Sequence, residues 1–146
     1  MEAKKRIALI AHDNKKFELV EWAIHHKEIL KNHELLATGT TGSMVEKELG
    51  QSVEKFQSGP LGGDQQIGAL IVEGKVDILI FFWDPMEALP HDPDIKALLR
   101  IGAVWNIAIA CDQATADFII SSPFLNNSYE RFMPDYDNYK NRKIVK

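Results

Sequence analysis

Residues 77–83 read DILIFFW, in which the six residues after Asp77 form an uninterrupted apolar run that ends on Trp83. Successive side chains of a strand point to opposite faces of a sheet. A run that is apolar at every position therefore predicts a strand whose two faces are both covered, as in the interior of a parallel sheet. We expect this segment to be a central strand with helices packed above and below it.

Strand-like and helix-like segments alternate on both sides of this run. The predicted strands are residues 6–11 (RIALIA), 34–37, 52–56, 77–83 and 106–111, and the predicted helices are residues 15–31, 43–49, 64–74, 93–104 and 115–121. Crossovers between parallel strands are right-handed and place helices on the sheet. The pattern predicts one α/β domain over residues 1–146, a three-layer doubly wound sheet of about five parallel strands. Ligands of such sheets bind at the carboxyl ends of the strands.

Composition narrows the class of protein. The chain has 146 residues, of which 45% are hydrophobic and 26% charged, and no apolar run is long enough to span a bilayer. The lone Cys111 cannot form an internal disulfide, so we expect a reducing, cytoplasmic location. A formal charge of −4 gives no general attraction to nucleic acid or to an anionic membrane. An anionic ligand would need local donors in a pocket.

Two glycine-containing segments follow predicted strands. Residues 38–42 read TGTTG and residues 58–63 read SGPLGG, and a predicted helix follows each. Glycine lets the backbone approach a ligand closely, and a helix N-terminus attracts an anion. TGTTG alone also fits an ordinary turn, but two such segments at neighbouring strand ends favour a phosphate site. Neither matches the nucleoside triphosphate or dinucleotide motifs.

Acidic residues and one histidine lie beside these segments. Asp64 is either the cap of its helix or a general base that reaches into the pocket. Asp92 and Asp94 suit the first turn of the next helix, because carboxylates are favoured near a helix N-terminus. His91 is either a plain surface residue or a neutral donor to a carbonyl group. A metal site made of His91, Asp92 and Asp94 is disfavoured, because no second His or Cys lies at a recognised spacing.

The remaining histidines and the cysteine carry no motif. His25, His26 and His33 fall in or just after the first predicted helix, where we expect them to be exposed to solvent. Cys111 lies in a predicted strand and nothing around it suggests an activated thiol. We therefore assign these four residues to the scaffold.

In their order and spacing, five segments resemble the signature of the methylglyoxal synthase family. They are His12-Asp13, TGTTG at 38–42, SGPLGGDQQ at 58–66, FFWDP at 81–85 and PHDPD at 90–94, and the likeness continues to PDY at 134–136. The resemblance implies a lyase that converts dihydroxyacetone phosphate to methylglyoxal and inorganic phosphate, without metal or organic cofactor. It also implies a homohexamer.

The resemblance also implies roles for individual residues. By position, Asp64 is the catalytic base, and His91 and Asp94 are its partners. The implied substrate and phosphate contacts are His12, Asp13, Lys16, Thr38, Gly39, Thr40, Thr41, Ser58, Gly59 and Asp84. We place the family's basic residue near the C-terminus at Arg142, and Lys143 is the alternative because this tail is one residue shorter after Tyr136.

These residue types suit the implied chemistry. A carboxylate removes a proton next to the ketone, and a donor stabilises the enediolate that forms. Triosephosphate isomerase begins with the same pair, a carboxylate and a neutral histidine. Holding the C–O bond to phosphate perpendicular to the enediolate plane would favour elimination of phosphate over isomerisation.

Fold alone leaves other functions open. The chain also resembles the regulatory domain of carbamoyl phosphate synthetase, so a noncatalytic sensor of phosphorylated metabolites is the main alternative. An isomerase or a purine-pathway cyclohydrolase of related fold is a third. Asp64, His91 and Asp94 favour catalysis, because a sensor needs the phosphate site but no base beside it.

Overall fold

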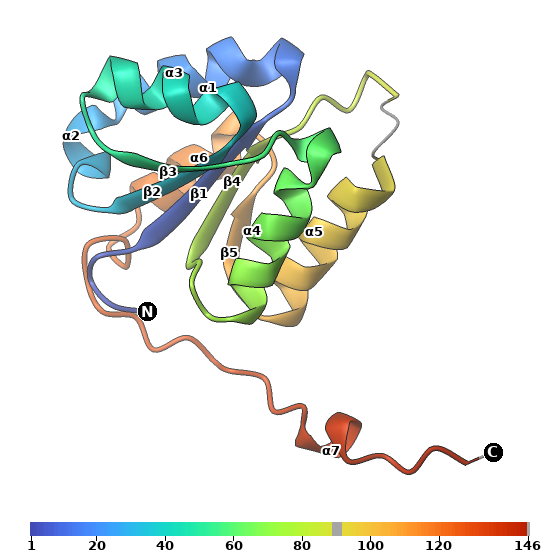
Figure 1. The fold of residues 1–146 in the computed structure, drawn as a ribbon. Coiled ribbons are helices and arrows are strands. Elements are labelled where there is room, and N and C mark those ends of the chain that lie inside the picture. The colour runs from blue at the N-terminus through green and yellow to red at the C-terminus, as the bar shows by residue number, and fades with distance from the viewer. Residues whose placement is uncertain (89–91, 146) are drawn as a thin grey trace.

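A computed structural model describes residues 1–88 and 92–145 and contains one five-stranded parallel sheet (Figure 1). The strand order is β3-β2-β1-β4-β5, and every pairing is parallel. The strands are β1 (Arg6–Ala11), β2 (Glu34–Thr38), β3 (Val53–Phe56), β4 (Ile78–Phe82) and β5 (Ala108–Ala110). The predicted α/β class, five strands and parallel sheet are confirmed.

Helices connect the strands. The helical elements are η1 (Asp13–Lys15), α1 (Lys16–His25), α2 (Lys27–Leu30), α3 (Gly39–Leu49), η2 (Gly59–Leu61), α4 (Gly63–Val72), α5 (Asp92–Val104), α6 (Gln113–Ile120) and α7 (Asp137–Lys140). The helix predicted over residues 15–31 is divided between α1 and α2. In the described part of the chain, no helix has the length and apolar character needed to cross a membrane.

The two faces of the sheet bury separate apolar cores. Ile7 and Leu9 of β1 pack on the side covered by α1, α3 and α6, and Ala8 and Ile10 pack on the side covered by α4 and α5 (Figure 1). This alternation follows from the two-residue period of a strand. All five residues of β4 are buried, as the apolar run at 78–82 predicts for a strand covered on both faces.

Strand order locates the crevice where a ligand is expected. From β1 the chain moves outward to β2 and β3, and it then returns to the other side of β1 to form β4. In doubly wound sheets, ligands bind where the order reverses in this way, outside the carboxyl ends of the strands. The crevice is therefore expected beyond Ala11 of β1 and Phe82 of β4, which are directly paired.

Two helices begin differently from the sequence prediction. The TGTTG segment is not a loop before a helix that starts at Ser43, because α3 already begins at Gly39. Gly39 has φ of +56°, so the chain can turn directly from β2 into the helix. Asp64 does not cap α4, since Gly62 occupies that position and Asp64 lies in the first turn.

Gly63 marks the closest approach in this part of the fold. A Cβ atom at position 63 would lie 1.9 Å from the carbonyl oxygen of Gln57. The Gly63 amide donates instead to the carbonyl of Ser58 (2.9 Å). Only glycine lets the start of α4 lie against the end of β3 in this way, and this contact fixes where Asp64 lies.

The expectation of solvent-exposed histidines is wrong for His33. His25 is exposed and His26 partly buried, but His33 is buried beside the start of β2. Its Nδ1 accepts a hydrogen bond from the Lys5 amide (3.0 Å), and its Nε2 lies 3.0 Å from Asn126 Oδ1. The ring therefore joins the start of the chain to the segment after α6, and a neutral ring with its proton on Nε2 satisfies both bonds.

We predict that His33 makes the protein less stable in acid. Burial lowers the pKa of His33 from 6.5, the Lys5 and Lys4 charges lower it further, and the bond to Asn126 opposes them. The unfolded chain then binds more protons below pH 6.5, so this contribution to stability is complete above that pH and declines as the pH falls toward the folded-state pKa. Urea unfolding between about pH 7.5 and 5.5 should show a shallower pH dependence for His33→Gln than for the wild type. The exposed His25→Gln is the control, and an unchanged slope in His33→Gln would contradict the assignment.

Candidate functional site: an anion cleft at the carboxyl ends of the strands

A cleft of about 280 Å³ lies at the expected crevice. Segments that follow β1, β2 and β3 contribute to it, together with the loop after β4. Its lining residues are Ile10, Ala11, His12, Asp13, Asn14, Lys16, Thr38, Gly39, Ser58, Gly59, Pro60, Asp64 and Glu87. Eight of these were predicted as site residues from the sequence: His12, Asp13, Lys16, Thr38, Gly39, Ser58, Gly59 and Asp64.

Lys16 supplies a positive charge at the cleft. Its ammonium group lies 2.8 Å from Thr40 Oγ1 and 2.7 Å from Asp13 Oδ1. The hydrogen bond and charge of Lys16 lower the pKa of Asp13 below its ordinary value. Because Lys16 is the first residue of α1 and Thr40 lies in the first turn of α3, this contact joins two helix starts beside the cleft.

Backbone geometry brings the start of α3 against the loop after β3. A Cβ atom on Gly39 would lie 3.3 Å from both Cα and Cβ of Ser58, and the Gly39 amide donates to the Gln57 carbonyl (3.2 Å). The N-termini of α3 and α4 therefore lie beside the same cleft. Partial positive charge at helix N-termini favours a bound anion.

Thr38 and Thr41 are buried at the junction of β2 and α3, and of the two only Thr38 is among the cleft residues. Thr41 is only 1% exposed, and its hydroxyl oxygen has no hydrogen-bond partner among the described residues. A buried hydroxyl group without a partner is costly, so its placement in the first turn of α3 fits a hydroxyl that serves a ligand.

Asp64 is the buried carboxylate of the cleft. It is 2% exposed and lies in the first turn of α4. It lines both the cleft and a shallow groove between α4 and α5, and Asp94 lines that groove as well. A carboxylate beside an anion site has the reach and the chemistry of a general base for a bound phosphorylated ligand.

His12 and Asp84 connect the ends of β1 and β4. The Asp84 amide donates to His12 Nδ1 (3.0 Å), which places the proton of a neutral imidazole on Nε2. The carboxylate of Asp84 accepts from the Asn14 side chain (3.1 Å) and from the Met86 amide (3.0 Å). These two hydrogen bonds are the main reason why the pKa of Asp84 is lowered. Asp84 therefore remains ionised, and although it is not among the cleft residues, it is bonded to two of them, His12 and Asn14.

Not every predicted site residue reaches the cleft. Arg142 lies in the C-terminal tail, where its guanidinium group stacks 3.6 Å from the ring centre of Tyr139 and donates to the Tyr139 carbonyl (2.7 Å). Figure 1 shows that this tail runs away from the body beyond the end of the sheet where the strands begin, and Lys143 belongs to the same tail. As far as residue 145, the tail after α6 does not return to the carboxyl ends of the strands, so this chain does not bring Arg142 to its own cleft.

The residues around the start of α5 are described only in part. His91 lies outside the described residues. Asp92 and Asp94 are both in the first turn of α5, as predicted for acidic residues at a helix N-terminus. Within residues 1–88 and 92–145, no group of three or more His, Cys, Asp or Glu side chains could hold a metal ion.

The sequence analysis missed five residues of the cleft: Ile10 and Ala11 at the end of β1, and Asn14, Pro60 and Glu87. Pro60 lies in η2, inside the glycine-containing segment 58–63. Because that segment was assigned to the site from the sequence, Pro60 could have been predicted as a site residue. Asn14 and Glu87 belong to no recognised motif. Only the pairing of β1 with β4 shows that they are neighbours.

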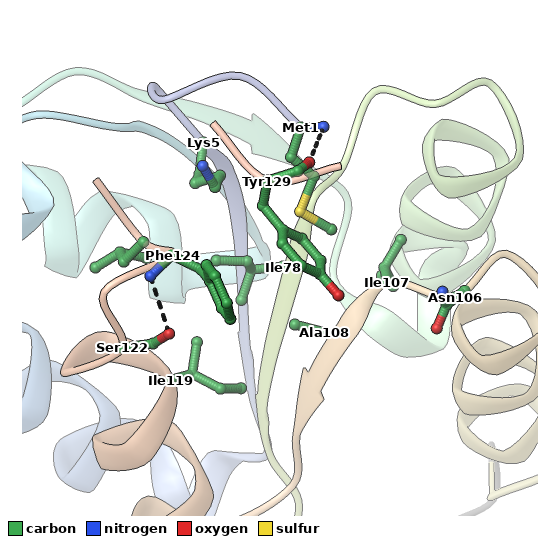
Figure 2. Close-up of a pocket in the computed structure, with 11 residues that line it drawn as sticks. Met1, Lys5, Ile78, Asn106, Ile107, Ala108, Ile119, Ser122, Phe124 and Tyr129 are labelled. Atoms are coloured by element: carbon green, nitrogen blue, oxygen red, sulfur yellow. Dashed lines mark hydrogen bonds between the residues drawn. The ribbon is translucent and has the colours of Figure 1, made fainter. Parts of the chain in front are cut away.

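A second cavity, of about 250 Å³, lies at the opposite end of the sheet (Figure 2). Ile78 and Ala108 at the strand beginnings line it, together with Phe124 and Tyr129. The Lys5 ammonium beside it already donates to the carbonyls of Glu2 and Asn127. The lining is mostly apolar, and its two cations, Lys5 and the Met1 N-terminus, are already bonded to carbonyl groups, so the first cleft suits a phosphorylated metabolite better and is the candidate active site.

The fold and the cleft together define a class: an open-sheet α/β protein whose strand ends form a cleft suited to a small anion, with a buried carboxylate in its wall. Residues 18–111 match the family model described as MGS-like domain. Relatives named methylglyoxal synthase include one from Saccharophagus degradans, 62% identical over 95% of this chain and 90% of the relative. Another, from Cellvibrio japonicus, is 58% identical over 98% of this chain and 93% of the relative.

A solved structure agrees with these sequence matches. The crystal structure of methylglyoxal synthase from Elizabethkingia anophelis superposes with a TM-score of 0.94 at 54% identity, covering 99% of this chain and 95% of that one. The chain belongs to the methylglyoxal synthase family, as the motif resemblance indicated.

We predict that inorganic phosphate stabilises this protein through Lys16. A ligand that binds only the folded state at about ten times its Kd raises the free energy of unfolding by about 1.4 kcal/mol. Lys16→Met should weaken phosphate binding about 10- to 100-fold, because it removes a charge-assisted hydrogen bond. Lys15→Met is the matched control, since Lys15 pairs with Glu18 outside the cleft. Thermal unfolding at increasing phosphate concentrations gives the comparison, and an equal response in Lys16→Met and wild type would exclude Lys16 from the anion site.

Proposed function

We propose that this protein converts dihydroxyacetone phosphate to methylglyoxal and inorganic phosphate, with Asp64 as the base. The observation that carries the proposal is the position of Asp64, a buried carboxylate in the wall of a cleft that also contains Lys16, Thr38 and the start of α3. Membership of the methylglyoxal synthase family supports it.

In the first step, Asp64 removes a proton from C3, the hydroxymethyl carbon next to the ketone. The electron pair of the broken C–H bond forms the C2–C3 double bond of an enediolate, and negative charge develops on the C2 oxygen. A neutral donor at that oxygen stabilises the charge. His91 is our candidate for this donor and Asp94 for the group that orients it. His12 is a further neutral imidazole at the cleft whose proton is placed on Nε2.

In the second step, the enediolate expels phosphate. The C3 hydroxyl group loses its proton and its oxygen forms the C3=O double bond, electrons move from the C2–C3 double bond to a new C1–C2 double bond, and the bond between C1 and the phosphate oxygen breaks. The released proton leaves with the phosphate. The enolate that remains takes up a proton at C1, and its C2 oxygen becomes the ketone of methylglyoxal. Lys16, Thr38, Thr40, Thr41, Ser58, Gly39 and Gly59 are the proposed phosphate contacts, and a cation with hydroxyl and amide donors suits the charge that develops on the leaving group.

A noncatalytic sensor of phosphorylated metabolites would use the same anion site. Such a sensor gains nothing from a buried carboxylate next to the anion, because a second negative charge there opposes binding. The repulsion between Asp64 and a bound anion is explained if the carboxylate takes a proton from the substrate. We therefore place catalysis ahead of sensing.

We also propose that the chain assembles as the homohexamer of the family in the cytoplasm. The tail after residue 130 exposes Phe132, Met133, Ile144 and Val145, and exposed apolar side chains in an extended segment suit burial against another subunit. In such an assembly, Arg142 could act at a neighbouring subunit's cleft, which would reconcile its predicted role with its position here.

The direct test of the base is Asp64→Asn. A positioned base contributes about 10²- to 10⁴-fold, so kcat for methylglyoxal formation should fall by that factor, equivalent to roughly 3 to 5 kcal/mol. Exchange of the C3 proton with deuterated solvent should slow in parallel. The variant should still be stabilised by phosphate, because the anion contacts are unchanged.

Asp112→Asn is the matched control for this substitution. Asp112 caps α6 at the same edge of the sheet, accepting from the Thr115 amide (2.7 Å), and it is not among the cleft residues. Asparagine caps a helix about as well as aspartate, so this variant should keep the wild-type rate. If Asp64→Asn retained both proton exchange and methylglyoxal release, Asp64 would not be the base.

A further inference from the structure

Asn14 joins two segments that the sequence places 70 residues apart. Its side-chain nitrogen donates to Asp84 Oδ2 (3.1 Å) and to Glu87 Oε2 (2.8 Å). A carboxamide nitrogen has two hydrogens, so this pair of bonds uses its full donor capacity. Asn14 lies in η1 after β1, and Asp84 and Glu87 lie in the loop after β4. The bonds therefore link the segments that follow β1 and β4, the two strands at which the strand order reverses.

The carboxylate that Asn14 contacts controls the conformation of its own loop. Asp84 Oδ1 accepts from the Met86 amide (3.0 Å), which is the local turn that an aspartate commonly forms with the backbone two residues later. The Asp84 backbone amide donates to His12 Nδ1 (3.0 Å), and the His12 ring meets Phe81 edge to face. A displacement of Asp84 would therefore disturb the ring orientation and tautomer of His12.

The charges nearby explain why a neutral donor suits position 14. Asp84 and Glu87 are two carboxylates that both face the Asn14 amide. The neighbouring cations are directed elsewhere, since Lys15 pairs with Glu18, and Lys16 with Asp13 and Thr40. The amide therefore holds two acidic groups at the cleft without competing with Lys16 for an anion.

We propose that Asn14 is a positioning residue of this enzyme: it fastens the loop of Asp84 and Glu87 to η1 and thereby holds His12 in its working orientation. The inference rests on the proposed function and deepens it. Asn14 and Glu87 lie outside the signature segments named above, so those segments assign neither residue a role. Both side chains are at the surface, where single polar pairs add little to stability. The cost of losing the contact should therefore appear in turnover rather than in the melting temperature.

The test is Asn14→Asp, which keeps the shape of the side chain but replaces both donor hydrogens by acceptors beside two carboxylates. We expect kcat to fall about 10- to 100-fold, KM for dihydroxyacetone phosphate to change less than threefold, and the melting temperature to stay within about 2 °C. Asn32→Asp, the same change in an exposed turn, is the matched control and should leave kcat unchanged.

A reversed pair tests the contact itself. In Asn14→Asp combined with Glu87→Gln, the new glutamine amide can donate to the new aspartate, so one of the two bonds is restored with opposite polarity. The double variant should recover at least threefold in kcat over Asn14→Asp. No recovery, or an unchanged kcat in Asn14→Asp, would overturn the proposal.

Hydrogen exchange separates this inference from the proposed function. The Asp84 and Met86 amides donate to side chains held by this contact, so both should exchange faster in Asn14→Asp than in wild type. A wild-type protein that forms no methylglyoxal would refute the proposed function, whereas unchanged exchange at these two amides would refute the role of Asn14 whatever the activity.

Discussion

β1 is hydrogen-bonded on both sides, to β2 and to β4, and the rest of the site depends on this double pairing. Leu9 is opposite Ala37 in β2, and Ala11 is opposite Phe82 in β4. The residues that follow these strands must then emerge at one edge, although they are far apart in sequence. A shift of one residue in the register of β1 against β4 would turn the side chains of one strand to the opposite faces of the sheet and would also separate His12 from Asp84.

The cleft combines two requirements that oppose each other electrostatically. An anion site needs donors and positive charge, and proton removal needs an ionised carboxylate close by. The fold supplies the two from different elements: Lys16 and the start of α3 contribute to the cleft from the segments after β1 and β2, and Asp64 comes from the first turn of α4. Glycine at 63 makes this placement feasible, because any side chain there would meet the Gln57 carbonyl.

Much of this arrangement could be predicted from the sequence, for physical reasons that differ from residue to residue. The β4 segment was clear because six consecutive apolar residues fit no solvent-exposed element, and the site segments followed because strand ends share one edge. The start of α3 was misplaced because glycine and threonine suggested a loop, whereas the positive φ of Gly39 lets the helix begin at once. His33 was missed because its burial depends on Lys5 and Asn126, which only the tertiary fold brings together.

Other parts of the site lie beyond what local patterns can indicate. Asn14 and Glu87 look like ordinary surface residues until β1 and β4 are paired. Arg142 is the opposite case: the family resemblance predicted a site contact for it, but this chain's own tail does not make that contact. Sequence motifs carry the chemistry that a family shares, but the contacts that hold it in place depend on which strands are neighbours.

Phosphorus NMR of the wild-type protein with dihydroxyacetone phosphate tests the central claim most directly, because it follows all three phosphorus species at once. Our account predicts that the substrate resonance is replaced by inorganic phosphate in equal amount, faster than with heat-inactivated protein, and that methylglyoxal accumulates in step. Appearance of glyceraldehyde 3-phosphate instead would show that the cleft holds the phosphate for isomerisation. A substrate resonance that shifts on binding but never declines faster than the inactivated control would identify a sensor, and either result would contradict the account.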